Sequence, residues 1–162
     1  MRIERVVINA SPLITLFRAD LHHLLPQLFP DLVVPEAVWE EVVNHPFTDP
    51  AAQGLPKSRW VRKVATQPSI NVLAWGLGAG ETGVLSFAQN NLDYTAIIDD
   101  RAARRCARVL GVAIMGTAGV VVLAKRHGLI DSVEKSLRRL QRAGLWLSEQ
   151  LIVKLAAEDN LA

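Results

Sequence analysis

Short apolar runs that alternate with stretches of helical spacing are the main pattern in this sequence. Most of these runs contain no interleaved polar residues, which is typical of strands covered on both faces of a parallel sheet. They predict strands at residues 6–8, 32–34, 60–65, 95–98 and 113–115. Helical spacing predicts helices at residues 13–18, 36–43, 101–110, 117–127 and 131–142, and from residues 81 and 148 onward. We therefore predict an α/β fold, a three-layer α/β/α sandwich with a central, mostly parallel sheet.

Local signals mark several boundaries of these elements. Ser11 followed by Pro12 predicts an N-cap and a first helical residue. Asp131 with Glu134 predicts a capping box, and Ser148 predicts the N-cap of a last short helix. Two stretches rich in Pro, Gly and polar residues predict loops, at residues 44–56 and 67–80.

Length and composition narrow the class of protein. The chain has 162 residues, half of them apolar, which suffices for one sizeable core. We predict a single domain over residues 1–162, on which C-terminal helices at about 130–160 pack. The one cysteine, Cys106, excludes an intrachain disulfide and fits a reducing compartment. The longest apolar run, residues 112–124, is shorter than the ~20 residues that a membrane helix needs, so we expect a cytoplasmic protein without a membrane partner.

Arginines gather at helical spacing, although the formal net charge is only +2. One cluster comprises Arg101, Arg104, Arg105 and Arg108, and another comprises Arg138, Arg139 and Arg142. Helical spacing places each cluster largely along one face. Such a face fits either ordinary solvation or contact with phosphates or an acidic partner, and the sequence leaves both readings open.

Acidic residues occupy positions where an α/β fold gathers chemistry. Glu81 opens a predicted helix, and Asp99 with Asp100 closes a predicted strand. The carboxyl ends of parallel strands and the first turns of the helices that follow them converge on one crevice. Several carboxylates in one crevice are typical of a divalent metal site. Each acid alone also fits a structural role, Glu81 as a first-turn acid and the aspartates as a helix N-cap.

Five motifs carry a resemblance to a known family. In chain order they are INASPLITL, VPEAVWEEVV, LGAGETGVLSFA, IIDDRAARRCARVLGV and MGTAGVVVLAKRHGLI. Together they cover nearly the whole chain and resemble the PIN-domain superfamily, which includes VapC-like proteins, and specifically its branch of predicted nucleic-acid-binding proteins of unknown function. The resemblance implies a metal-dependent ribonuclease, which in many members is the toxin of a toxin–antitoxin pair.

The resemblance also implies which residues form the site. The family's four acidic positions fall in chain order on Asn9, Glu41 (with Glu40 less favoured), Glu81 and Asp99. Three further positions match neighbouring polar residues of the family's site, namely Asp100 beside the late aspartate, Ser11 two residues after the first acidic position, and Thr117 on the rim.

The implied cofactor is Mg²⁺ or Mn²⁺, because hard cations take oxygen ligands and can activate water toward a phosphodiester. In this interpretation Asp99 and Glu81 hold the metal. Glu41 and Asp100 ligate through water or orient the attacking water, and Ser11 positions a water or a phosphate. The cofactor therefore links all five residues in one catalytic hypothesis.

Asn9 departs from the wider superfamily's pattern, which has aspartate at this position. Its amide oxygen can still ligate a metal but brings no negative charge, so we expect weakened, manganese-preferring nuclease activity. An alternative is a non-catalytic PIN-like module that binds RNA or a protein through its arginine faces. A receiver-like signalling domain is a third hypothesis, disfavoured because such domains place an acidic pair on the first strand, where this chain has Asn9.

Partners follow from the same resemblance. We expect RNA as the substrate, a small cognate antitoxin protein and a homodimer. The candidate nucleic-acid contacts are Arg101, Arg104, Arg105 and Thr117.

Overall fold

The computed structural model describes residues 2–44, 46 and 48–160. Its described part contains a five-stranded sheet in the order β3-β2-β1-β4-β5. The strands are β1 (Arg5–Ile8), β2 (Asp31–Pro35), β3 (Val61–Val64), β4 (Thr95–Ile97) and β5 (Ile114–Met115). All four pairings are parallel, which confirms the predicted α/β fold and makes the sheet parallel throughout. The order runs outward from β1 in both directions, so the sheet has a topological switch point between β1 and β4.

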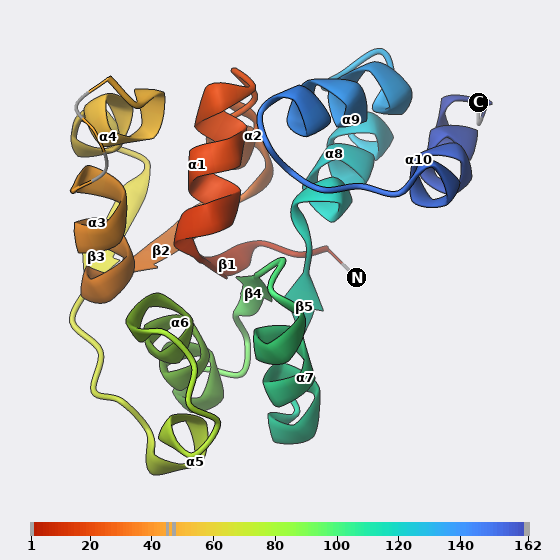
Figure 1. Ribbon diagram of the computed structural model, residues 1–162. Coiled ribbons are helices and arrows are strands. Elements are labelled where there is room, and N and C mark those ends of the chain that lie inside the picture. Colours follow the sequence, from red (N-terminus) through yellow and green to blue (C-terminus); the bar gives the residue numbers. More distant parts are fainter. Residues whose placement is uncertain (1, 45, 47, 161–162) are drawn as a thin grey trace.

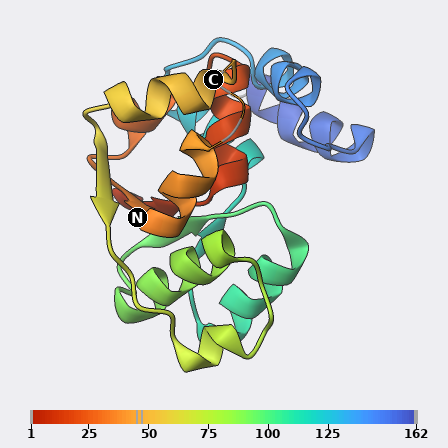
Figure 2. The same ribbon diagram turned by 60° about the vertical axis from the view of Figure 1, so that its left-hand side comes forward.

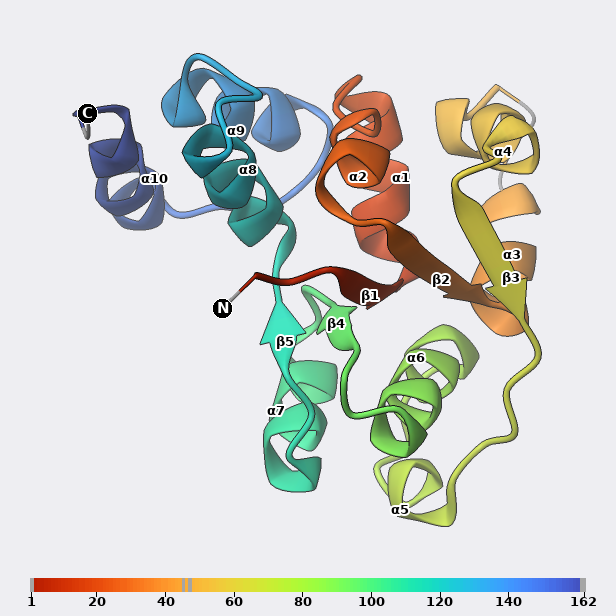
Figure 3. The same ribbon diagram turned by 180° about the vertical axis from the view of Figure 1, so that it is seen from behind.

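Helices cover both faces of this sheet (Figures 1 and 2). One face carries α1 (Ala10–Arg18), α2 (Leu24–Leu28), α3 (Glu36–Val43), α4 (Pro50–Gly54), α8 (Thr117–Arg126), α9 (Val133–Arg142) and α10 (Glu149–Ala156). The other face carries α5 (Ile70–Leu73), α6 (Ala79–Asn90) and α7 (Arg101–Leu110). The view from behind shows β1, β2 and β4 between these two layers (Figure 3). The three-layer sandwich predicted from the sequence is therefore confirmed.

The central strands explain why the apolar runs lack alternation. Val6, Val7 and Ile8 of β1 are fully buried, and so are Ala96 and Ile97 of β4. Both faces of these strands meet helices, so side chains that point either way lose contact with water. Removing one such aliphatic side chain from water stabilises the fold by about 1.5–3 kcal/mol.

The helix after β1 begins earlier than predicted. It starts at Ala10, and its N-cap is Asn9 rather than Ser11. Pro12 is tolerated because the first N–H groups of a helix have no intrahelical partner, so a missing N–H within the first turn removes no hydrogen bond. The shift places Ser11 in the first turn of α1, directly beside the end of β1.

Parts of the two predicted loops are helical. In the first, Asp49 caps α4 by accepting a 2.9 Å hydrogen bond from the Ala51 N–H, and Pro50 follows as the first helical residue. A 3₁₀ turn, η1 (Leu55–Lys57), continues from α4. In the second, α5 forms one short helical segment. The general abundance of Pro and Gly concealed the Asp-Pro capping signal.

The C-terminal helices are tied to each other and to α1. Ser132, not Asp131, caps α9, while Ser148 caps α10 as predicted. Asp159 in the terminal 3₁₀ turn η2 (Ala157–Asn160) accepts hydrogen bonds from the first N–H groups of α9. Arg139 on α9 donates to the carbonyl oxygens of Ala19 (2.5 Å) and Asp20 (3.1 Å) at the end of α1. These bonds hold α9 against α1, the helix that leads away from Asn9.

Candidate functional site

Asn9 lies at the carboxyl end of β1 and is almost completely buried, with 3% of its surface exposed. Its Nδ2 points toward Glu81 Oε1 at 3.5 Å, the long limit of a hydrogen bond. Its Oδ1 has no hydrogen-bond partner among the described residues. A buried carbonyl oxygen without a partner is unusual in a folded protein, because burying it without a hydrogen bond costs about 1–3 kcal/mol. This atom therefore marks a place where a polar ligand is expected.

Two glutamates lie near this oxygen, Glu81 from the first turn of α6 and Glu41 from α3. A Cβ at Gly80 would lie 3.2 Å from Asn9 Oδ1 and 3.7 Å from Glu41 Oε1. Glu81, the next residue, is the one that Asn9 Nδ2 approaches. Since α3 packs against α6, Glu41 reaches the same place from the other side of the sheet. The structure thus brings together three of the predicted site residues, Asn9, Glu41 and Glu81.

Gly80 keeps this place open, so replacing it with alanine is expected to weaken divalent-metal binding about tenfold or more. The added methyl group would crowd Asn9 Oδ1 at 3.2 Å, closer than ordinary van der Waals contact. Titration of Mn²⁺ into the protein, followed by calorimetry, measures the effect.

Gly83→Ala is the matched control on the same helix. Its Cβ would be similarly tight, at 3.3 Å, but against Pro35 Cβ and not against Asn9. Equal loss of metal affinity in both variants would mean that Gly80 acts only through the packing of α6, and thermal melts of both variants separate the two causes.

Asp99 lies one residue beyond the pairing partner of Asn9. The register pairs Ile8 with Ile97, so Asn9 and Asp99 leave neighbouring strands at the same edge. Both oxygens of Asp99 accept hydrogen bonds from Thr117, at 2.9 Å from the backbone N–H and at 2.5 Å from the hydroxyl. We expected Thr117 on the rim of the site, but it is fully buried, so its hydroxyl orients Asp99 and does not face solvent.

Asp100 takes the structural role that the sequence left open. Its Oδ2 accepts a 2.9 Å hydrogen bond from the Ala103 N–H, so it is the N-cap of α7. Its side chain is exposed. Asp100 thus lies next to Asp99 in the chain, and one of its carboxylate oxygens accepts the capping hydrogen bond of α7.

The predicted acids do not form one compact group. In the described ranges, no three His, Cys, Asp or Glu side chains lie close enough to hold a metal ion. Asn9, Glu41 and Glu81 gather around Gly80, whereas Asp99 is held by Thr117. The separation has a physical reason, because Thr117 donates to both oxygens of Asp99 and like charges repel one another at short range.

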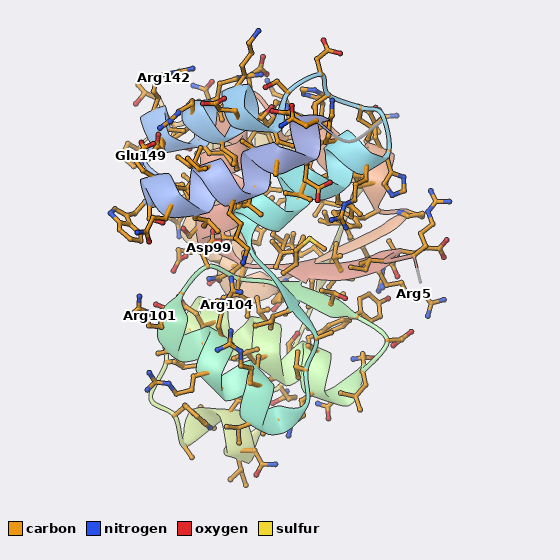
Figure 4. The ribbon with its side chains drawn as sticks, turned by 90° about the vertical axis from the view of Figure 1, so that its right-hand side faces the viewer. Arg5, Asp99, Arg101, Arg104, Arg142 and Glu149 are labelled. Atoms are coloured by element: carbon orange, nitrogen blue, oxygen red, sulfur yellow. The ribbon has the colours of Figure 1, made fainter. Side chains whose placement is uncertain are left out.

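An arginine surface adjoins Asp99. A pocket is lined by Asp99 and four arginines of α7, Arg101, Arg104, Arg105 and Arg108. A Cβ at Gly116 would lie 2.8 Å from Arg104 Nη1 and 3.2 Å from Asp99 Oδ1, so both side chains lie over the same glycine. Figure 4 shows Asp99 and Arg104 near each other, with Arg101 at the start of α7. Exposed guanidinium groups on a helix whose other face is buried are suited to bind phosphate.

Ser11 is exposed in the first turn of α1 and lines a pocket together with Glu41 and Arg18. Sequence reasoning overlooked Gly80 and Arg18. A glycine inside the first turn of a helix, where alanine is more stable, signals a close approach by another group. Arg18 carried no such local signal, because its neighbours in space come from distant segments.

The available donors fit a hard divalent cation. Asn9 Oδ1 is a buried oxygen without a hydrogen-bond partner in the part of the chain that the structure describes, and the carboxylates of Glu41 and Glu81 lie beside it. Such cations take carboxylate and amide oxygens as ligands, and magnesium usually retains several waters. Two carboxylates and an amide oxygen are a sufficient protein contribution to such a site.

Comparison with known proteins agrees with the fold. The family model described as a PIN domain matches residues 5–160. The chain matches no curated protein and no solved structure in the corresponding searches. Among the described residues, no helix combines the length and the apolar character required to cross a membrane. From residue 5 to residue 160, all five strands and the candidate site included, the chain belongs to the PIN-domain family.

Proposed function

We propose that this protein is a metal-dependent ribonuclease that hydrolyses phosphodiester bonds. The PIN domain is a nuclease-type fold whose members generally use divalent metal ions. The observation that carries the proposal is the buried, unpartnered Asn9 Oδ1 beside Glu41 and Glu81, at the carboxyl edge of the sheet. This edge, next to the switch point, is where open parallel sheets bind their ligands.

Asn9, Glu41 and Glu81 would hold Mg²⁺ or Mn²⁺, with Asp99 beside them on the neighbouring strand. When bound, such an ion lowers the pKa of a coordinated water and neutralises charge on phosphoryl oxygens. Thr117 fixes the carboxylate of Asp99 through two hydrogen bonds.

The arginines of α7 bind the RNA phosphates next to Asp99. Phosphate contacts of this kind position a nucleic acid without reading its sequence. Ser11 lies on the opposite side, in the pocket with Glu41, where its hydroxyl can donate to a water or to a phosphate oxygen. The scissile phosphate would thus lie between α1 and α7.

The first experiment is incubation of the purified protein with a mixed pool of single-stranded and structured RNA in Mg²⁺ or Mn²⁺, beside a lane with EDTA. We expect cleavage that requires metal and is faster in Mn²⁺. Intact RNA in every lane, together with no metal binding by calorimetry, would contradict the proposal.

A second candidate function is a non-catalytic module that binds RNA through α7. It is favoured by the amide in place of a carboxylate at Asn9 and by the lack of a three-acid group within the described residues. This module would bind RNA equally well with and without EDTA, and cleave it in neither case.

The toxin role, a small antitoxin partner and a homodimer also belong to the proposal. They are supported by the family resemblance alone. Co-purification of the protein with the product of a neighbouring short reading frame tests the antitoxin partner. The mass of the purified protein in solution tests the homodimer.

A further inference from the structure

A groove runs from the candidate site toward the C-terminal helices. One pocket is lined by Ser11, Ile14, Thr15, Arg18, Glu41, Ala143 and Gly144. A second is lined by Arg18, Ala19, Arg139, Arg142 and Ala143. The two pockets share Arg18 and Ala143, so they adjoin one another, and we call them together the groove. It leads from Glu41 past α1 to the arginines at the end of α9.

The far end of this groove carries uncompensated positive charge. Arg142 is exposed and has no hydrogen-bond or ion-pair partner among the described residues. Arg139 donates to the carbonyl oxygens of Ala19 and Asp20, which satisfy one of its nitrogens but do not neutralise its charge. An anion is therefore the ligand that this end of the groove favours.

Arg18 adds directed donors in the middle of the groove. Its Nε and Nη2 donate to Asp49 Oδ2 at 2.9 and 2.6 Å. Burial raises the pKa of Asp49, but hydrogen bonds from Arg18 and from the Ala51 N–H outweigh this effect, so the pKa lies below its ordinary value and the pair stays ionised. The Arg18 side chain remains 45% exposed, against 3% for Asp49. A guanidinium has five N–H donors, so this fixed side chain retains donors for a ligand.

The walls of the groove are held in place before any ligand arrives. Arg139 pins α9 to the end of α1, and Asp159 holds the start of α9. The backbone then turns away at Gly144, whose φ of 113° is a conformation that other residues rarely adopt. A pre-formed site loses less conformational entropy when it binds.

Figure 4 shows Arg142, which lines this groove, on the same side of the molecule as Arg101 and Arg104 of α7. Arg142 lies on one side of Asp99 and Arg101 lies on the other. Glu149 also lies on this side, but its carboxylate pairs with Arg138, so its charge is compensated. Two basic surfaces therefore flank the acids, one on α7 and one on α1 and α9.

We propose that the groove formed by Arg18, Arg139 and Arg142 is a second phosphate-binding site, which holds the RNA strand on the Glu41 side of the candidate active site. This inference rests on the proposed ribonuclease function. An RNA strand is a ligand whose regularly spaced charges can occupy both basic surfaces while one phosphodiester lies between them at the acids. The substrate is then a single strand long enough to span both surfaces, and not a mononucleotide.

The test measures binding without cleavage, by fluorescence anisotropy of labelled single-stranded RNA in EDTA. Strand lengths run from about 4 to 16 nucleotides, the range that single-strand-binding grooves occupy. Arg142→Gln removes a charge from the groove. The matched control is Arg59→Gln, because Arg59 is exposed and precedes the edge strand β3, at the amino ends of the strands. Thermal melts verify that both variants fold.

We expect Arg142→Gln to weaken binding of the longest strand roughly three- to tenfold and to reduce the slope of log K against log salt by about 1. The shortest strand should bind wild type and Arg142→Gln alike, because it cannot reach both surfaces. Arg59→Gln should match wild type at every length.

Three results would overturn the groove assignment. These are wild-type binding by Arg142→Gln at all lengths, an equal loss in Arg59→Gln, and displacement of RNA by poly-glutamate at equal charge concentration, which would indicate an acidic protein partner. Cleavage in Mg²⁺ or Mn²⁺ is scored separately. A length-dependent loss of RNA affinity in Arg142→Gln without any cleavage would reject the ribonuclease function but support the groove assignment. Cleavage without that loss of affinity would support the ribonuclease function and reject the groove assignment.

Discussion

Replacing Glu81 with glutamine is expected to reduce metal-dependent RNA cleavage about 100-fold or more, since a bound cation stabilises the transition state by several kcal/mol. Glu81 is one of two carboxylates beside the buried amide of Asn9. Glutamine keeps the size and one oxygen of the side chain but removes the charge that attracts the cation. Initial cleavage rates in Mn²⁺, with calorimetric titration of the metal, measure both effects.

Glu134→Gln is the matched control, because Glu134 is also an acid in the first turn of a helix but lies on α9. Both substitutions remove a favourable interaction with a helix dipole, worth about 0.3–1 kcal/mol. Only Glu81→Gln should lose cleavage. If Glu81→Gln cleaved RNA at the wild-type rate, the site around Gly80 would not be the active site.

Replacing Asn9 with aspartate is expected to raise the affinity for Mg²⁺ or Mn²⁺ about tenfold, because a unit of negative charge adds roughly 1.4 kcal/mol or more of attraction at a partly buried site. The change introduces the acid that the resemblance to PIN domains implies at this position. It also places a third negative charge beside Glu41 and Glu81. Without metal, this repulsion and the burial of the new carboxylate should lower the melting temperature.

Melting curves therefore provide a second readout. The melting temperature of the Asn9→Asp protein should be lower than that of wild type in EDTA. Added metal should raise it by more than it raises the melting temperature of wild type. Asn71→Asp, which introduces the same charge at an exposed position of α5, should leave both curves unchanged. A metal-independent melting curve for Asn9→Asp, with unchanged cleavage, would remove Asn9 from the proposed site.

Most of the fold was predictable because its signals are local. The apolar runs at β1 and β4 lack alternation since both faces of those strands are covered, and the chain order of strands and helices then indicates a parallel sheet. The bounds of α3 and α7 agree with the prediction. The errors concern the ends of helices. At α1, Ser11 followed by Pro12 resembles a helix start, but the N-cap is Asn9. At α4, the N-cap Asp49 is hidden in a polar stretch.

The candidate site was predictable only in part. The sequence indicates that Asn9, Glu81 and Asp99 lie at the carboxyl edge of the sheet, because each follows a strand or opens a helix. Their roles as metal ligands, like those of Glu41 and Asp100, stay predictions, and so does the role of Ser11 in positioning a water or a phosphate. So do the contacts of Arg101, Arg104 and Arg105 with RNA.

Secondary structure, the order of elements and the edge at which the polar residues gather follow from the sequence, because periodicity and capping act over a few residues. The partners of each polar atom were decided by the tertiary structure. Thr117 donates hydrogen bonds to both oxygens of Asp99, and Asn9 Oδ1 and Glu41 both lie close to Gly80. Arg18 and Arg142 line the same pocket. These contacts join segments far apart in the chain, and hydrogen bonds depend on distance in space, so no local pattern encodes them.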